Sequence, residues 1–416
     1  MEYHTRFYQR LYEPAKRRNA LRIAGRVKKL KSGKLKFVIF LKLYASRSSE
    51  NTPAIRKGGA GLLILISLFI SMEVKSQPEK KEYASRINII QQNIHHYFYD
   101  STFSVYNEFF PADTGNKKKY SFLWPLCGLL QAANETDAAL MSHHCFDTVL
   151  ARIQPYYDNA LPKPGYNSYL VYPIKEARFY DDNQWIGIAC MDAYRRTKVE
   201  TYLQQGLLIY NFMMTGFDLV SSGGLYWKEY DYSTKNTCSN GPGALLALQL
   251  YKTTHSQKYL DTALLLYNWV NKELVSPDNL YYDNIQLPSG KVDKRLYTYN
   301  AGTMLQSSVL LYHITKDRIY LTMAKKIAAA SLSYFYKDKT FPGNYWFNAV
   351  LLRGYVELYK ADHNKKYILA MQQYGETIWH KERSPLNLIG KHTRKELLDQ
   401  AAVMEIFASL AQLSAN

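Results

Sequence analysis

Apolar residues recur at the spacing of an α-helix from about residue 82 to the end of the chain. They stand at i, i+3, i+4 and i+7, as Leu245, Leu248 and Leu250 illustrate. The alternation typical of half-buried strands is scarce. The pattern therefore predicts an all-α protein with twelve helices, at residues 82–98, 119–133, 137–153, 182–197, 200–214, 239–254, 257–274, 299–315, 318–335, 344–360, 363–379 and 396–413.

Short and long connections alternate between the predicted helices. The short turns are Asn134-Glu135-Thr136, Lys198-Val199, His255-Ser256, Lys316-Asp317 and Asp362-His363. The long loops are rich in Gly, Pro and Asn and span residues 154–180, 215–238, 275–298, 336–343 and 380–395. A weak repeat of about 50–60 residues accompanies this alternation, with one helical hairpin in each unit.

Six helical hairpins with all short turns at one end predict a closed (α/α)6 barrel, with one helix of each hairpin inside and one outside. The long-loop end should form the functional funnel, because function collects on loops held by a rigid scaffold. An open solenoid is the competing architecture. It usually needs atypical capping repeats at its ends, and the sequence offers none.

Polar and aromatic residues recur where the predicted inner helices begin. Taken singly, Ser239 and Asn240 are ordinary helix caps, and Trp124 and Trp346 are more often core residues than ligand platforms. Their shared placement at one end of the barrel instead favours a sugar-binding cleft. The positions are Trp124-Pro125, Asp181-Asp182, Ser239-Asn240-Gly241, Tyr299-Asn300 and Tyr345-Trp346.

The stretch Tyr180-Asp181-Asp182-Asn183-Gln184-Trp185 contains the most specific chemistry. A helix cap and a charge on the positive end of the helix dipole would explain one aspartate, but not two beside Tyr and Trp. Glycoside hydrolysis requires one carboxylate to meet the developing cation and one carboxylic acid to protonate the leaving oxygen. Two neighbouring carboxyl groups also separate their pKa values, which keeps one protonated near neutral pH.

The net charge of +18 lies mostly in the first 76 residues. They contain 17 Lys and Arg against 4 Asp and Glu, whereas the remainder contains 36 against 31. A body with a net charge of only +5 argues against nucleic-acid binding by the folded domain.

The N-terminal segment predicts export. Residues 56–76, with Arg56-Lys57 before a short apolar run, have the form of a signal peptide cleaved before Gln77. The apolar run is too short for a comfortable membrane span. Residues 1–55 are a basic extension, either untranslated or a disordered arm for a membrane surface or a nucleic acid, and residues 77–416 form the expected domain.

Neither a metal nor a cofactor is predicted. The four cysteines lack the C-x-x-C spacing of zinc or redox sites, and export would permit disulfides with three possible pairings. Cys190 falls on an apolar face and should be buried. His143 and His144 face differently on a helix, so they do not form a ligand pair. The other cysteines are Cys127, Cys145 and Cys238.

Four segments, in order over residues 90–416, together resemble glycoside hydrolase family 76, the endo-acting α-1,6-mannanases. The aspartate-pair motif is Tyr180-Asp181-Asp182-Asn183-Gln184-Trp185. The others are Gly223-Gly224-Leu225-Tyr226-Trp227 with Lys235-Asn236-Thr237 and Ser239-Asn240-Gly241, then Tyr297-Thr298-Tyr299-Asn300-Ala301-Gly302, and Trp346-Phe347 with Arg353. Three positions depart from the family pattern: Ile186 replaces a frequent Trp, and Asn348-Ala349 replace a common Lys-Gly pair.

This resemblance implies an (α/α)6 barrel and a retaining endo-α-1,6-mannanase acting on α-mannan or mannooligosaccharides. From the predicted signal peptide we expect the enzyme to be exported, to the periplasm or outside the cell, and we expect it to be a monomer. Asp181 would be the nucleophile and Asp182 the acid/base. Retention expects carboxyl groups about 5–5.5 Å apart, which adjacent residues can reach. The expected substrate-binding residues are Tyr180, Asn183, Trp185, Trp227, Asn240, Tyr299, Asn300 and Trp346.

Two other functions stay open at this point. An unsaturated-glucuronide hydrolase of the same fold would need a basic pocket for the uronate carboxylate. A glycan-binding protein of the helical-repeat type would not need the aspartate pair, and the lipid-anchor cysteine expected for such a protein is missing.

Overall fold

The computed structural model describes residues 80–112, 115, 118–142, 144–173 and 175–414. The predicted extension, signal peptide, cleavage site before Gln77 and His143 lie outside these residues. The described part contains twelve α-helices: α4 (Lys80–Asn93), α5 (Leu123–Leu140), α6 (Cys145–Ile153), α7 (Tyr180–Thr197), α8 (Glu200–Met213), α9 (Thr237–Thr254), α10 (Gln257–Glu273), α11 (Thr298–Thr315), α12 (Arg318–Phe335), α13 (Tyr345–Asp362), α14 (Lys366–Lys381) and α15 (Leu397–Leu413).

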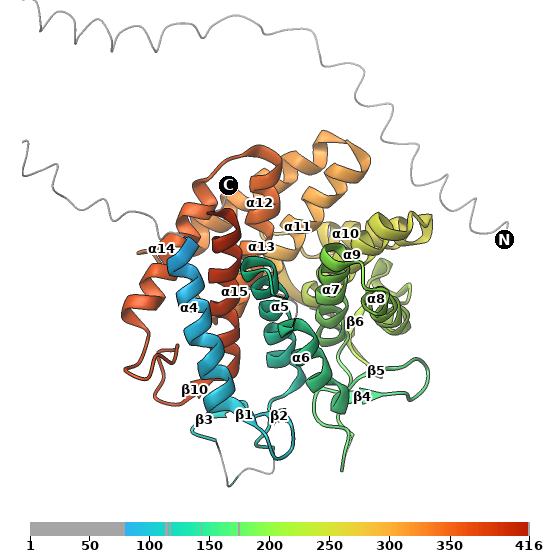
Figure 1. Ribbon diagram of the computed structural model, residues 1–416. Helices are drawn as coiled ribbons and strands as arrows, with labels where there is room; N and C mark the ends of the chain where they lie inside the picture. Colours follow the sequence, from blue (N-terminus) through green and yellow to red (C-terminus); the bar gives the residue numbers. More distant parts are fainter. Residues whose placement is uncertain (1–79, 113–114, 116–117, 143, 174, 415–416) are drawn as a thin grey trace, which may run out of the picture. The chain divides into compact units, whose positions relative to one another are not determined.

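Every second helix lies in an inner ring. Along the chain, α5 packs on α7, α7 on α9, α9 on α11, α11 on α13 and α13 on α15, and α15 packs back on α5 (Figure 1). The inner helices are buried on nearly all sides, as expected of helices inside a large core. At Gly302 on α11, an added Cβ would lie 2.6 Å from the Val350 carbonyl oxygen of α13, so this pair approaches closely. The predicted all-α (α/α)6 barrel is confirmed.

The two ends of the described chain close the ring, because α4 packs on α15 (Figure 1). Arg86 of α4 is 2% exposed and forms ion pairs with Glu82 and with Glu376 of α14. Its guanidinium also lies 5.2 Å from the ring centroid of Phe407 on α15. The sixth helical pair is thus formed by α4 and α15, which lie at opposite ends of the described chain, rather than by a hairpin.

Short turns join each inner helix to the next outer helix. Five inner helices end in a left-handed residue whose N–H donates to the carbonyl four residues earlier. Four of the five predicted short turns are confirmed in this way. The capping residues are Met141, Lys198, His255, Lys316 and His363.

The predicted turn at Asn134-Glu135-Thr136 is wrong, because these residues lie inside α5. Their polarity has another cause. The Asn134 side-chain oxygen accepts a hydrogen bond from Arg196 of α7, at 3.2 Å from Nη2. Three positions after Asn134, the Asp137 carboxylate accepts from the backbone N–H groups of Cys145 and Phe146, at 3.2 and 3.0 Å. Asp137 therefore caps α6 from the preceding helix, and the real turn follows Met141.

Two long loops form a sheet that the sequence did not indicate. Strands β6 (Tyr226–Lys228), β7 (Asp231–Asn236), β8 (Tyr282–Gln286) and β9 (Lys291–Leu296) make one antiparallel sheet in that order. Because the strands are short and largely polar, they lack the apolar alternation by which strands are recognised.

Short strand pairs and single turns complete the loops. The two-stranded pairs join β1 (Tyr99–Asp100) to β2 (Val105–Tyr106), β3 (Phe109–Phe110) to β10 (Lys395–Glu396), and β4 (Tyr157–Asp158) to β5 (Gly165–Tyr166). A π-helical turn, η1 (Ile94–Phe98), follows α4. The 3₁₀ turns are η2 (Gln154–Tyr156), η3 (Met214–Gly216) and η4 (Val220–Ser222).

All four cysteines are free thiols in this structure, and Cys190 is fully buried, as predicted from its apolar surroundings. Within the described residues, no helix is both long enough and apolar enough to span a membrane.

A buried ion pair joins two neighbouring inner helices. Arg353 of α13 donates from Nε and Nη2 to the two carboxylate oxygens of Glu405 on α15, at 2.6 and 2.8 Å. Its guanidinium lies 5.4 Å from the ring of Trp185 and 5.9 Å from that of Trp346. Removing one partner of such a pair leaves an uncompensated charge in the core.

We therefore expect Arg353→Met to lower the free energy of unfolding by about 3–5 kcal/mol. The double variant Arg353→Met/Glu405→Leu should recover most of this loss, because it removes both charges together. Urea unfolding at equilibrium measures both changes. A double variant as unstable as the single one would contradict this explanation.

Candidate active site

A cavity of about 620 Å³ opens at the long-loop end of the inner helices, where the sequence placed the funnel. Asp181 and Asp182, the second and third residues of α7, both line it and are partly buried. The rest of its lining is Phe122, Trp124, Ser168, Phe179, Trp185, Trp227, Asp231, Ser233, Thr234, Asn236, Cys238, Asp283, Asn284, Arg295, Tyr297, Tyr299, Trp346 and Phe347.

The aspartate pair does not cap its helix. Phe179 occupies the cap position of α7 and makes no side-chain capping bond. Both carboxyl groups stand in the first helical turn, where the helix dipole favours negative charge. The capping explanation is therefore excluded for Asp181 and Asp182, and their side chains face the cavity instead.

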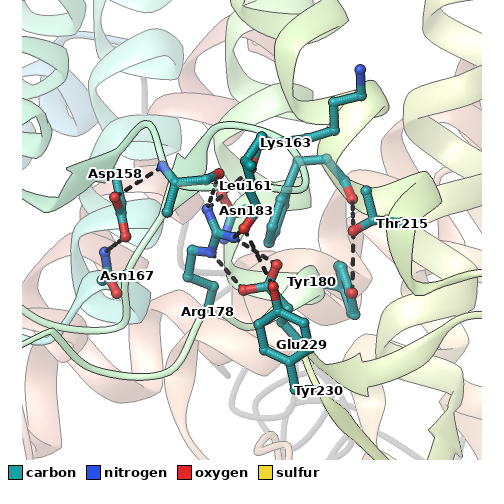
Figure 2. Close-up of polar contacts among 12 residues, drawn as sticks. Asp158, Leu161, Lys163, Asn167, Arg178, Tyr180, Asn183, Thr215, Glu229 and Tyr230 are labelled. Carbon is teal, nitrogen blue, oxygen red and sulfur yellow. Dashed lines mark hydrogen bonds and ion pairs between the residues drawn. The ribbon is translucent and has the colours of Figure 1, made fainter.

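The residues just before the pair anchor the surrounding loops. Arg178 is buried, and its Nε and Nη2 donate to the carboxylate of Glu229, both at 2.6 Å. The same guanidinium donates to the carbonyl oxygens of Ala160, Leu161 and Lys163, at 3.0–3.3 Å. Figure 2 shows Arg178 between these two groups of partners. One side chain thus ties the loops before α7 and around β6 together beside the aspartates.

Tyr180 packs against residues outside the cavity and so holds the start of α7 in place. Its hydroxyl pairs with that of Thr215 at 3.3 Å (Figure 2). Its ring packs on Phe212 and against Gly216, where an added Cβ would lie 2.4 Å from the Tyr180 ring. Tyr180 is buried and is not among the residues that line the cavity, so the structure gives it a packing contact rather than a ligand contact.

Asp181 lies in a mixed environment. Trp227 Nε1 donates to its Oδ2 at 3.2 Å, whereas its Oδ1 is buried without a partner among the described residues. Burial raises the pKa of Asp181 to about 6, while hydrogen bonds from Cys238 and Trp227 act in the opposite direction. The Asp181 carboxyl is therefore mostly ionised at neutral pH.

The pKa of Asp182 is raised as well. Burial raises it well above its ordinary value, and the neighbouring Asp181 charge raises it further. Beside an ionised Asp181, Asp182 favours the protonated form. The site thus contains a carboxylate and a carboxylic acid on consecutive residues, which are the two groups required for acid-assisted nucleophilic displacement.

Aromatic rings form much of the cleft. Trp346 lies edge-on to both Trp124 and Trp185, with ring centroids 5.8 and 5.0 Å away. Tyr299 stacks on Phe347 with centroids 4.2 Å apart. Trp227 is 39% exposed and offers the most accessible indole of the cleft. Of the predicted binding residues, Trp185, Trp227, Tyr299 and Trp346 thus line the cavity together with the aspartates.

The side chains of Asn183 and Asn240 do not line the cavity, because they are hydrogen-bonded to the backbone of the preceding loops. Asn183 Oδ1 accepts from the N–H of Tyr166 at 2.7 Å, and its Nδ2 donates to the carbonyl oxygens of Tyr166 and Phe179. Asn240 makes the same three bonds to the backbone of Leu225 and Asn236. Both amides are fully buried, and neither lines the cavity.

The same pair of side-chain hydrogen bonds to a loop residue recurs at the fourth residue of α15, where Gln400 bonds the N–H and carbonyl of Ile389. On α11, Asn300 is the third residue, and its buried side-chain amide has no partner among the described residues. Asn300 does not line the cavity either. The polar residues that recur at inner-helix starts therefore serve mainly to fix the preceding loop.

Two asparagines from the sheet were missed by the sequence reading. Asn236 at the end of β7 and Asn284 on β8 are register partners in adjacent strands. Both are buried and line the cleft, and the Oδ1 atom of each lacks a protein partner. Buried acceptors of this kind need a donor, such as a ligand hydroxyl or water. Asn236 stands in one of the segments that resemble the family, but it was not among the predicted binding residues, because its pairing with Asn284 depends on segments about 50 residues apart.

Acidic groups dominate the charge of the cleft. Asp181, Asp182, Asp231 and Asp283 line it, and Arg295 is the one basic residue among the described residues that do. Arg295 is paired with Asp293 at 2.6 Å and approaches Asp283 at 3.4 Å. A search of the described residues finds no group of three or more His, Cys, Asp or Glu that could hold a metal ion.

Comparisons of the sequence with known proteins agree with this chemistry. The family model for glycosyl hydrolase family 76 matches residues 84–362. The mannan endo-1,6-alpha-mannosidase DCW1 of Saccharomyces cerevisiae is 32% identical to this chain over 174 residues. The mannan endo-1,6-alpha-mannosidase DFG5 of Candida albicans is 31% identical over 176 residues. Each alignment covers 38% of this chain, and it spans 38% of DCW1 and 39% of DFG5.

Solved structures extend the likeness over the whole barrel. A family 76 mannosidase from Bacteroides thetaiotaomicron has a TM-score of 0.74 at 28% identity, covering 80% of this chain and 99% of its own. The α-1,6-mannanase of Salegentibacter sp. HEL1_6, as an inactive variant in complex with α-1,6-mannotriose, has a TM-score of 0.66 at 21% identity with the same coverage. This chain belongs to glycosyl hydrolase family 76.

Proposed function

We propose that the protein is a retaining endo-α-1,6-mannanase that hydrolyses internal α-1,6-mannosidic bonds of mannan. The observation that carries this proposal is the pair of consecutive carboxyl groups, Asp181 and Asp182, that both face one aromatic cleft. The names of the relatives supply the linkage. The chain spans only 38% of the length of DCW1 and 39% of that of DFG5, so the activity of those proteins is part of this proposal.

In the first step, Asp181 attacks the anomeric carbon while Asp182 donates its proton to the glycosidic oxygen. The bond to the leaving sugar breaks, and a glycosyl ester forms on Asp181. In the second step, the Asp182 carboxylate takes a proton from water, the resulting oxygen attacks the anomeric carbon, and Asp181 departs as a carboxylate. Two inversions at one carbon give net retention.

The surroundings of the pair suit these roles. The Trp227 indole N–H donates to Asp181 Oδ2 and so fixes the orientation of the attacking carboxylate. The low polarity of the aromatic cleft keeps Asp182 protonated until the leaving oxygen needs its proton. Trp185, Trp227, Tyr299 and Trp346 would stack on sugar faces, and Asn236 with Asn284 would accept hydrogen bonds from sugar hydroxyls.

The Salegentibacter protein supports the assignment of the pair. In that mannanase, a variant with two consecutive aspartates replaced by asparagine is inactive and was obtained with α-1,6-mannotriose. Asp181 and Asp182 form the corresponding kind of pair at the cleft of this chain.

An uronide substrate fits the cleft less well. A uronate carboxylate would meet Asp181, Asp231 and Asp283, and the one basic lining residue, Arg295, is already paired with Asp293. This charge balance favours a neutral glycan such as mannan.

We also propose that the domain at residues 77–416 acts as a monomer after export, with residues 56–76 as its signal peptide and residues 1–55 as a basic extension.

We expect Asp181→Asn and Asp182→Asn to abolish turnover of α-1,6-mannooligosaccharides while the fold is kept. Loss of the acid/base should cost about 10²–10⁴-fold in kcat, and loss of the nucleophile at least as much. Mass spectrometry of the products measures the loss. Asp261→Asn, an exposed change on α10, is the matched control, and wild-type rates in either cleft variant would refute the assigned roles.

Trp227→Phe should change the pH dependence as well as the rate. The indole N–H lowers the pKa of Asp181, so its loss raises that pKa above about 6. Since Asp181 must be ionised to attack, the acidic limb of the kcat/KM profile should move to higher pH, whereas the basic limb set by Asp182 stays in place. If the variant is slower but its acidic limb does not move, Trp227 contacts the sugar without tuning the pKa of Asp181.

Asn236→Ala and Asn284→Ala should each lower kcat/KM on mannotetraose by about fivefold, the value of one neutral hydrogen bond of about 1 kcal/mol. Neither Oδ1 atom has a protein partner, so Asn236→Ala should change thermal stability little, whereas Asn284→Ala should lower it slightly because Asn284 Nδ2 donates to Asp283 at 3.1 Å. Asn364→Ala, at an exposed turn before α14, is the control. Equal kinetics for all three variants would show that the sheet does not contact substrate.

A further inference from the structure

The hairpin of β6 and β7 presents an exposed tyrosine at its tip, beside the candidate active site. Tyr230 is the second residue of the two-residue turn between Lys228 and its register partner Asp231, and its side chain is 69% exposed. Asp231, the next residue, lines the cavity, and Trp227 of the same hairpin donates to Asp181. Tyr230 therefore stands at the rim of the cleft, just outside the residues that line it.

The backbone at Tyr230 is strained. Its φ is 59°, in the left-handed region. Glycine or asparagine usually occupies such a position in a turn, because the left-handed conformation brings Cβ close to the following carbonyl oxygen. A bulky aromatic residue in this conformation is uncommon and costs free energy of folding. The exposed ring recovers little of that cost by burial, so the tyrosine indicates a role other than folding.

The ring of Tyr230 is nevertheless held in place. Its hydroxyl donates to the carbonyl oxygen of Leu161 at 3.3 Å (Figure 2). Arg178 Nη2 donates to the same oxygen at 3.2 Å and to the carboxylate of Glu229, the other residue of the turn. The side chain is thus fixed at its backbone and at its hydroxyl. A rigid aromatic face loses little conformational entropy when a ligand stacks on it.

The charged residues of the hairpin tip are already paired. Glu229 forms an ion pair with Arg178 at 2.6 Å, and Lys228 forms one with Asp231 at 3.1 Å. A surface whose charges are compensated in this way suits a neutral partner better than a charged one. A neutral glycan that leaves the cleft past Asp231 meets this description and reaches Tyr230 next.

We propose that Tyr230 is an outer sugar platform, which stacks on a mannosyl unit of the substrate beyond those held inside the cavity. This inference rests on the proposed mannanase function and adds to it a contact that only a longer chain makes. The contact forms with the bound substrate and with the transition state alike, so it lowers KM and leaves kcat unchanged. The platform therefore makes the enzyme favour long mannan chains over short fragments.

Initial rates of the full chain on α-1,6-mannotriose and α-1,6-mannohexaose test this role. We expect Tyr230→Gly to raise KM for the hexaose about fivefold, the value of one aromatic contact, with no change in kcat or in either constant for the triose. The same variant should raise Tm by about 2 °C, because glycine adopts the left-handed conformation without strain. Lower affinity together with higher stability is an outcome that a structural role for the ring would not produce.

Two further variants separate the ring from the strain. Tyr230→Phe keeps the ring and should retain a KM for the hexaose close to that of the wild type. Lys339→Gly is the matched control, because Lys339 is an exposed turn residue with a φ of 63°. It should raise Tm similarly and leave KM unchanged.

An unchanged KM for the hexaose in Tyr230→Gly, an equal rise for triose and hexaose, or a lower Tm would each overturn the outer platform. The proposed function fails in a different way, since the wild type would then cleave neither substrate.

Discussion

The burial of two adjacent carboxyl groups in one helical turn is the constraint on which the rest of the site depends. Desolvation raises the pKa of both, and their mutual repulsion prevents both from being ionised together. An arrangement of this kind is unfavourable for folding unless the surrounding structure holds it in place. The ring provides that support, because α7 is packed between α5 and α9 and cannot turn its acidic residues toward solvent. The free-energy cost of burying the two carboxyl groups is thus offset by the packing of α7 in the core.

The loops around the pair are fixed by buried side chains rather than by regular structure. Asn183, Asn240 and Gln400 each bond the N–H and carbonyl of one residue in the preceding loop, as a neighbouring strand would. Arg178 with Glu229 joins two such loops beside Asp181. Polar groups that are buried and fully bonded specify a single conformation. A rigid cleft built from long loops can therefore hold catalytic groups with the accuracy that displacement at one carbon requires.

The sequence was sufficient for the architecture and for the aspartate pair, because both depend on local patterns. Helical periodicity and alternating loop lengths indicated the ring, and two consecutive aspartates beside Tyr and Trp indicated the chemistry. The errors arose where a residue's partner is distant in sequence. Asn134 resembles a turn residue until Arg196 is seen beside it, and Asn183 resembles a sugar ligand until its bonds to Tyr166 are known. Asn236 and Asn284 gained their place in the cleft only through the pairing of β7 with β8.

Arg353 gives the ring two chambers with different chemistry. On one side its guanidinium faces Trp185 and Trp346, which line the candidate active site, and on the other it lines a second cavity of about 480 Å³. Glu405 neutralises the arginine, so it adds little net field to either side. A hydrophobic plug could separate the chambers equally well and with less desolvation cost. A planar cation, however, satisfies the faces of two indole rings and a carboxylate at once, which leaves Trp346 fixed edge-on to Trp185 in the cleft.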